Sequence, residues 1–194
     1  MCPYNILPKI YLYGDGLFMA HMYKCSDYLP YPRIGDVKKN EKYAQLLLDD
    51  YAGRDSELTA ITQYIYQHFT MDDINREIAN TTMSIAKVEM KHLELLGEAI
   101  VKLGGCPVFR GGYENKDEYW NGRNPVYSVN PIEVLRANIH AEKTAIENYS
   151  KRVAMIDEPD IQNLLKRIIR DEQVHYMIYS NLLKRINNKS GKKR

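Results

Sequence analysis

The sequence is poor in cysteine, and it lacks both a long apolar run and an excess of charge of one sign. Its three cysteines, Cys2, Cys25 and Cys106, form no Cys-x-x-Cys pair and are not the even set expected of a disulfide framework. No apolar run approaches the length of a membrane span, and Lys9 and Asp15 interrupt the stretch where a secretory signal would lie. These absences predict a cytoplasmic protein that does not bind a membrane.

The charge balance argues against a nucleic-acid-binding protein. The chain carries 27 basic and 25 acidic residues, for a formal net charge of +2, and both signs are spread along its length. A nucleic-acid-binding domain would need a concentrated basic face. The basic cluster at residues 189–194 is interpreted as a solvated tail.

The length and composition predict one domain. A chain of 194 residues with 44% hydrophobic side chains can bury one substantial core. Residues 1–40 are rich in proline and tyrosine and show no sustained period, so they are interpreted as an irregular N-terminal leader without an assigned function. We expect residues 41–188 to form the folded domain, followed by the tail.

Hydrophobic periodicity in residues 41–188 predicts an all-α fold with four helices. We expect helices over residues 41–69, with Gly53 tolerated inside; from about 71 to 104; from 131 to about 157; and from 159 to about 187. An aspartate at 72 or 73 is the expected cap of the second helix, Gly104 and Gly105 its stop, and Asn130 followed by Pro131 the start of the third. The short turns predict two antiparallel hairpins, joined by a crossover at residues 104–130.

Two of these helices carry the same anomaly in their apolar faces. In the second helix the stripe of core positions includes Glu89 and His92, and in the fourth it includes Glu172 and His175. A glutamate and a histidine three residues apart share a helix face, so both would point into the core. Burying carboxylates without compensating positive charge costs several kcal/mol or more, and neither stripe holds a lysine or arginine near these positions. A metal ion is the natural partner.

An internal repeat supplies two further carboxylates. The segments ELTAITQY, starting at Glu57, and EKTAIENY, starting at Glu142, agree at five positions and lie 85 residues apart, while the two Glu-x-x-His pairs lie 83 residues apart. The whole hairpin therefore looks duplicated. Glu57 and Glu142 would join the two pairs in a common core. Four carboxylates carry a charge of −4, which two divalent ions would cancel.

Each of these features also has an explanation that involves structure alone and no metal chemistry. The six side chains could form a polar network without a metal, although such networks seldom repeat a Glu-x-x-His twice. Tyr64 and Tyr149 each follow the repeated glutamates by seven residues and so share their helix face. They could support the chemistry of the site as catalytic residues, or pack between helices with one hydrogen bond each.

The pattern resembles the ferritin-like superfamily, which includes bacterioferritins, rubrerythrins and manganese catalases. The resemblance covers residues 41–187 and rests on the six residues above, on the stretch LLLDDYAGRDSELTAITQYIYQHF, and on EMKH at 89–92. It implies a ferritin-like four-helix bundle that binds two metal ions, iron or manganese. It also implies that Glu57 and His92 hold one ion, that Glu142 and His175 hold the other, and that Glu89 and Glu172 bridge them.

The chain departs from these relatives in ways that bear on function. A full rubrerythrin has an iron centre held by four cysteines, so this chain resembles a rubrerythrin without that domain and would need an external electron donor. Ile139 and Ala145 stand where a rubrerythrin-like site places an additional glutamate. Asp171, which precedes Glu172, is the type of residue that accepts a hydrogen bond from the opposite histidine, whereas Val88 precedes Glu89. We therefore expect the two histidines to be held differently.

Four functions remain open from the sequence. The first is an oxidoreductase whose dinuclear metal centre acts on hydrogen peroxide or dioxygen. The others are a manganese catalase, an iron-binding or storage protein with ferroxidase activity, and a structural coat or scaffold protein that retains a metal site. Bundles of this kind often pair through an exposed face, so we expect a homo-oligomer, at least a dimer.

Overall fold

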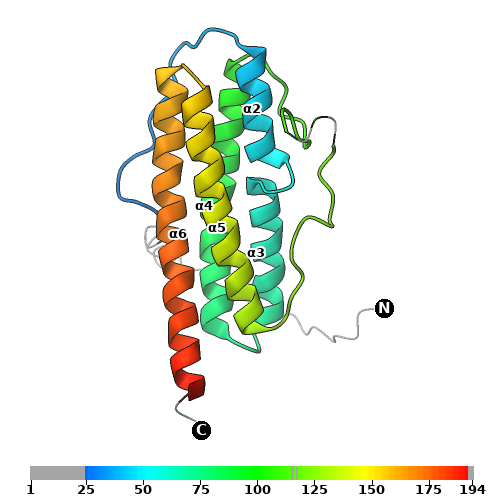
Figure 1. The fold of residues 1–194 in the computed structure, drawn as a ribbon, viewed down its shortest axis with the longest axis vertical. Helices are drawn as coiled ribbons and strands as arrows, with labels where there is room; N and C mark the ends of the chain where they lie inside the picture. Colours follow the sequence, from blue (N-terminus) through cyan, green and yellow to red (C-terminus); the bar gives the residue numbers. More distant parts are fainter. Residues whose placement is uncertain (1–24, 115, 117, 192–194) are drawn as a thin grey trace, which may run out of the picture.

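The computed structural model describes residues 25–114, 116 and 118–191. These residues form helices and contain no strand beyond two isolated bridges in the loop after residue 104 (Figure 1). The helices are α2 (Glu41–Ala52), α3 (Glu57–Met71), α4 (Arg76–Lys102), α5 (Pro131–Met155) and α6 (Pro159–Gly191). Within the described residues, no helix is apolar enough over a sufficient length to span a membrane.

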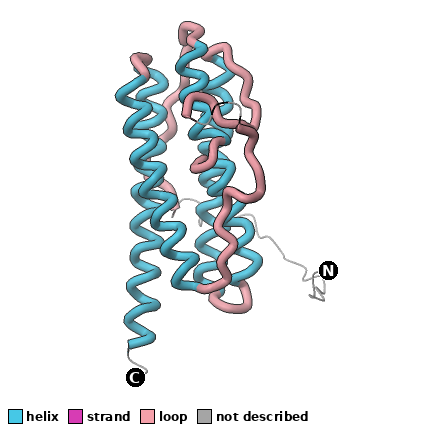
Figure 2. Tube along the Cα trace, turned by 45° about the vertical axis from the view of Figure 1, so that its right-hand side comes forward, coloured by secondary structure: helices cyan, strands magenta, loops and turns pink. Residues whose placement is uncertain are grey.

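The helices form the predicted bundle of two antiparallel hairpins. Helix α3 packs along α4, and α5 packs along α6, while α2 continues the line of α3 and also contacts α4 (Figure 1). The crossover leaves the end of α4, runs the length of the bundle beside α2 and α3, and enters α5 at the opposite end (Figure 2). The all-α, four-helix prediction is therefore confirmed.

The prediction of one continuous helix over residues 41–69 is wrong. The chain breaks at residues 53–56, where Gly53 is extended and donates its N–H to the carbonyl of Asp49 at 2.9 Å. Ser56 then caps α3, because its hydroxyl accepts the N–H of Thr59. As a result Glu57 is the first residue of a helix, where the N–H groups of the first turn favour a negative charge.

Most other helix ends follow the sequence signals. Gly104 ends α4 with a positive φ of 87°, and Asn130 caps α5 with Pro131 in its first turn. The prediction that an aspartate at 72 or 73 caps α4 is wrong, because α3 extends to Met71 and Asn75 caps α4 instead. Helix α6 continues to Gly191, past the predicted end at 187. Residues 1–24 of the leader and 192–194 of the tail lie outside the described residues.

Over the described residues, the apolar core consists of two separate clusters. The upper cluster, at the top in Figure 1, joins α2 to the second half of α4, the end of α5 and the first half of α6. The lower cluster joins α3 to the first halves of α4 and α5 and the second half of α6. Along α4, α5, α6 and the α2–α3 pair, the predicted metal ligands lie between the residues of the two clusters.

Asp49 of α2 holds the crossover against the bundle. Its carboxylate accepts three backbone N–H groups from residues 112–114, at 2.9, 3.0 and 2.7 Å. The backbone approaches α2 so closely at Gly112 that a Cβ atom there would lie 2.0 Å from the carbonyl oxygen of Gln45. Only glycine fits this contact without a shift of the loop or the helix.

Arg152 of α5 compensates the acidic groups around this anchor. It is 1% exposed, and its guanidinium lies 3.1 Å from Asp50, 3.4 Å from Asp49 and 3.0 Å from Glu114. Burial raises the pKa of Asp50 to about 7, although Arg152 acts in the opposite direction. One cation thus faces three carboxyl groups, and its removal would leave the negative charge of the buried Asp49 and Asp50 without a compensating cation nearby.

Candidate metal centre

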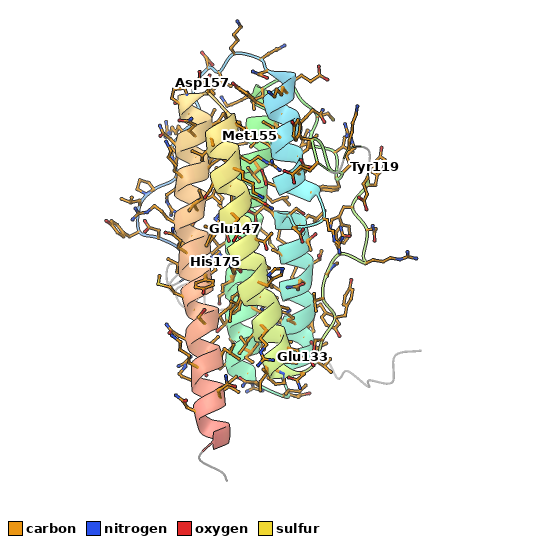
Figure 3. The ribbon with its side chains drawn as sticks, viewed as in Figure 1. Tyr119, Glu133, Glu147, Met155, Asp157 and His175 are labelled. Atoms are coloured by element: carbon orange, nitrogen blue, oxygen red, sulfur yellow. The ribbon has the colours of Figure 1, made fainter. Side chains whose placement is uncertain are left out.

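The six predicted ligand side chains converge at mid-length of the bundle. Figure 3 shows His175 roughly midway between Asp157, in the turn between α5 and α6, and the opposite end of the bundle near Glu133. Helix α3 contributes Glu57, α4 contributes Glu89 and His92, α5 contributes Glu142, and α6 contributes Glu172 and His175. Each of the six is at most 4% exposed.

The side chains form two groups that share two carboxylates. One group is Glu57, Glu89, His92 and Glu172, and the other is Glu89, Glu142, Glu172 and His175; within each group, one ligand atom from every residue lies within 4.8 Å of the others. These are the pairs, and the two shared glutamates, that the resemblance to ferritin-like proteins implies, and their role as metal ligands stays a prediction.

The distances show how each histidine faces its group. Nδ1 of His92 lies 2.8 Å from Glu89, 3.1 Å from Glu172 and 3.6 Å from Glu57. Nδ1 of His175 lies 3.0 Å from Glu89 and 3.4 Å from both Glu142 and Glu172. Both rings therefore turn the same nitrogen toward the shared carboxylates.

The potential metal-ligand atoms of the six residues fit a pair of cations. Both oxygens of Glu89, Oε1 of Glu172 and Nδ1 of both histidines each lie within ion-pair distance of another atom of this set, but none of these atoms makes a hydrogen bond to a described residue. Buried polar atoms are normally satisfied, so a set of converging unsatisfied atoms needs an explanation. Carboxylate oxygens with imidazole nitrogens form a donor set that suits iron and manganese.

The pKa shifts of the ligand residues also indicate a cluster that lacks positive charge. Burial and the neighbouring Glu89 carboxylate raise the pKa of Glu57 to about 8, and the same two causes raise the pKa of Glu142 well above its usual value. Burial alone would also raise the pKa of Glu172, but the two histidines outweigh it and lower the pKa. Burial would lower the pKa of both histidines, but the carboxylates raise it well above 6.5. Protons thus partly neutralise a cluster that cations could neutralise fully.

Tyr64 and Tyr149 cross-link the two repeats. The hydroxyl of Tyr64 on α3 donates to Glu142 on α5, and the hydroxyl of Tyr149 on α5 donates to Glu57 on α3. Both tyrosines are buried, and burial together with the nearby carboxylates raises the pKa of each well above 10. The hydroxyls therefore keep their protons and orient the two unshared glutamates.

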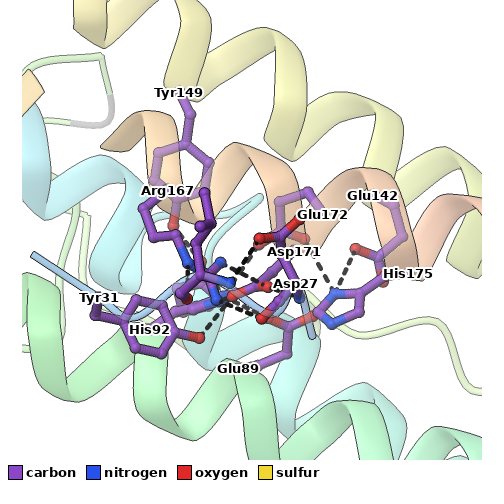
Figure 4. A network of polar contacts seen from close by, with 12 residues as sticks. Asp27, Tyr31, Glu89, His92, Glu142, Tyr149, Arg167, Asp171, Glu172 and His175 are labelled. Atoms are coloured by element: carbon purple, nitrogen blue, oxygen red, sulfur yellow. Dashed lines mark hydrogen bonds and ion pairs between the residues drawn. The ribbon is translucent and has the colours of Figure 1, made fainter. Parts of the chain in front are cut away.

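One side of the site has a network that the sequence revealed only in part. Nε2 of His92 lies 3.0 Å from Asp171, as expected, and Figure 4 shows Asp171 at the centre of further contacts. Tyr31 donates its hydroxyl to Asp171 at 2.6 Å, and Arg167 pairs with Asp171 at 2.7 Å. Burial opposes ionisation, but these contacts lower the pKa of Asp171 to about 2. Sequence reasoning missed Tyr31, for which the leader offers no signal, and Arg167, whose four-residue spacing from Asp171 was a usable one.

A cavity of about 110 Å³ reaches the site between α3 and α5. Its lining includes the buried Glu57, Glu89, Glu142 and Glu172 and the exposed Val126 of the crossover. This volume admits a few water-sized molecules and no bulky substrate.

Comparison with known proteins agrees with this geometry. The ferritin-like domain family matches residues 54–188. A bacterioferritin from Desulfovibrio desulfuricans is 33% identical over 139 residues, which is 70% of this chain and 72% of that protein. Protein CotJC from Bacillus subtilis is 26% identical over 173 residues, which is 80% of this chain and 90% of that protein.

Solved structures share the fold. KatB, a manganese catalase from Anabaena, superposes with a TM-score of 0.75 at 23% identity, covering 83% of this chain and 80% of KatB. The crystal structure of the Desulfovibrio desulfuricans bacterioferritin, which is described as having a diiron site, superposes with a TM-score of 0.60 at 32% identity, covering 76% and 81% of the two chains. With its matching residues, helix arrangement and buried cluster of carboxylates and histidines, the chain belongs to the ferritin-like family.

Proposed function

We propose that this protein is a dinuclear-metal oxidoreductase that acts on hydrogen peroxide or dioxygen. The observation that carries the proposal is the pair of buried ligand groups that share Glu89 and Glu172 and whose four carboxylates line a small cavity. A pocket of this size, lined by carboxylates, suits a small, neutral substrate. Two iron or manganese ions held there would supply a redox couple between divalent and trivalent states.

Each residue has a separate task in this proposal. Glu89 and Glu172 would contact both ions, Glu57 and His92 would complete one position, and Glu142 and His175 would complete the other. The hydroxyls of Tyr64 and Tyr149 orient the unshared glutamates. The apolar clusters above and below the site exclude bulk water, which strengthens the electrostatic interactions inside it.

Similarity to two known proteins supports alternative functions. Similarity to a bacterioferritin favours an iron-binding protein with ferroxidase activity, and the shared fold of KatB favours a manganese catalase. A coat or scaffold role, with the metal site kept for stability, is the further alternative.

Metal analysis and peroxide assays separate these functions. Protein expressed with both metals available would be analysed for iron and manganese, then supplied with peroxide with and without an electron donor. Peroxide consumption only with a donor supports the peroxidase, consumption without a donor supports the catalase, and oxidation and retention of added Fe²⁺ supports the ferroxidase. A fully metallated protein that does none of these contradicts the oxidoreductase proposal.

We also propose that the protein forms at least a dimer. Large apolar side chains remain exposed on the described surface, including Phe69, Phe109 and Tyr119, at 50% or more. Such residues are common in protein interfaces. Sedimentation as a monomer at micromolar concentration would contradict this proposal.

A further inference from the structure

The two histidines of the site are supported very differently on the side away from the carboxylates. Nε2 of His92 lies 3.0 Å from the fully buried carboxylate of Asp171. Nε2 of His175 is also fully buried, but it has no hydrogen-bond partner among the described residues. The repeat explains the difference, because Val88, at 3% exposure, holds the position in α4 that Asp171 holds in α6.

Asp171 is itself fixed by the segment before α2. One oxygen accepts the backbone N–H of Asp27 at 2.6 Å and pairs with Arg167 at 2.7 Å, and the other accepts the hydroxyl of Tyr31 at 2.6 Å (Figure 4). Asp171 therefore cannot turn away from His92 without breaking several contacts.

The same segment is held on the surface of α6. Arg167 donates to the carbonyls of Leu29 and Asp27 at 2.6 and 2.9 Å, and its guanidinium lies 4.4 Å from the centre of the Tyr31 ring. Arg170 adds an ion pair to the Asp27 side chain at 2.9 Å. Residues 27–31 thus form a strap, and the strap supports Asp171 from outside the bundle.

This support affects the ligand nitrogen. An acceptor at Nε2 keeps the ring proton there, leaves the Nδ1 lone pair for a metal, raises the basicity of the ring and fixes its orientation. His92 has all of these advantages. His175 receives none of them from a side chain in the described part of the chain, because a valine cannot accept a hydrogen bond.

We propose that the two metal positions differ in affinity. The ion beside His92 is held tightly, because the strap fixes Asp171 and Asp171 supports the His92 ring, whereas the ion beside His175 is exchangeable. The inference rests on the proposed ligands but concerns which position retains its ion. Loss of a hydrogen-bond partner behind a metal ligand commonly weakens metal binding about 10- to 100-fold, so a difference of this size is expected between the positions.

The test measures Mn²⁺ binding to the full-length, metal-free protein by titration calorimetry with a competing chelator. Wild type should bind two ions in two steps with Kd values at least tenfold apart. Asp171→Asn should weaken the tight step by 10-fold or more and leave the weak step within about threefold. Tyr31→Phe should act in the same direction with a smaller effect, and Tyr28→Phe, at an 86% exposed tyrosine in the same segment, should change neither step.

Crystals grown with one equivalent of Mn²⁺ then locate the tight ion by anomalous scattering, which should appear beside His92. Two ions bound with equal affinity, equal scattering at both positions, or equal weakening of both steps by Asp171→Asn would each overturn the inference and leave the proposed function standing. Protein that binds no Mn²⁺, Fe²⁺ or Co²⁺ would overturn both.

Discussion

Replacing one shared carboxylate should disable both metal positions at once. Glu89 lies 2.8 Å from His92 and 3.0 Å from His175, so its two oxygens face the two groups. Glu89→Gln preserves the size of the side chain and removes one negative charge at a residue that is only 1% exposed. Four carboxylates balance two divalent ions, whereas three would leave a buried positive charge without a partner.

The expected loss follows from that imbalance. An uncompensated buried charge costs about 3 kcal/mol or more, which corresponds to roughly a hundredfold increase in Kd. Both ions should therefore be lost on dialysis. Glu57→Gln removes the same amount of charge, but the lost ligand belongs to only one group, so the ion beside His92 should be weakened more than the other.

Glu94→Gln is the matched control. It lies on the same helix, but its side chain is 59% exposed and pairs with Lys91 at the surface. Metal content after dialysis, chelator competition and circular dichroism would be compared for wild type and the three variants. Retention of both ions at wild-type affinity by Glu89→Gln, or identical losses in Glu89→Gln and Glu57→Gln, would refute the assignment of Glu89 as a shared ligand.

Three further predictions concern the surroundings of the site. Arg152→Met should lower the free energy of unfolding by about 3–5 kcal/mol in urea denaturation, and adding Asp50→Asn should restore part of the loss because one buried carboxylate is neutralised. Gly112→Ala should cost about 1–3 kcal/mol through its clash with α2, whereas Gly122→Ala, where the nearest atom would lie 3.7 Å away, should unfold like wild type. Tyr149→Phe should keep both metals in elemental analysis and lower the rate of peroxide consumption; loss of metal would instead make this hydroxyl necessary for binding.

The bundle and the ligand cluster could be predicted because their signals are local or repeated. A glutamate and histidine in an apolar stripe stand out on a helix, and the second copy of the hairpin brings the partner glutamates into place. The continuous first helix was a wrong prediction, since a single Gly53 costs only about 1 kcal/mol in a helix and does not by itself predict a break. Ser56 was the missed signal, as a good N-cap residue directly before Glu57.

The contacts of the strap could not be predicted in the same way. Asp27 and Tyr31 lie about 140 residues from Asp171 in the chain. Irregular segments have no periodicity that reveals which side chain they will meet. Only the three-dimensional structure shows that this part of the leader supports a histidine of the site.

The division of the core has a consequence for how the protein tolerates sequence change. Among the described residues, the upper and lower apolar clusters are separate and the metal-ligand residues lie between them along the helices, so a substitution in one cluster leaves the packing within the other unchanged. Distant sites without shared partners generally have additive effects on stability. Each end of the bundle can therefore acquire its own packing and surface residues over evolution, or by engineering, while the six residues in the middle stay as they are.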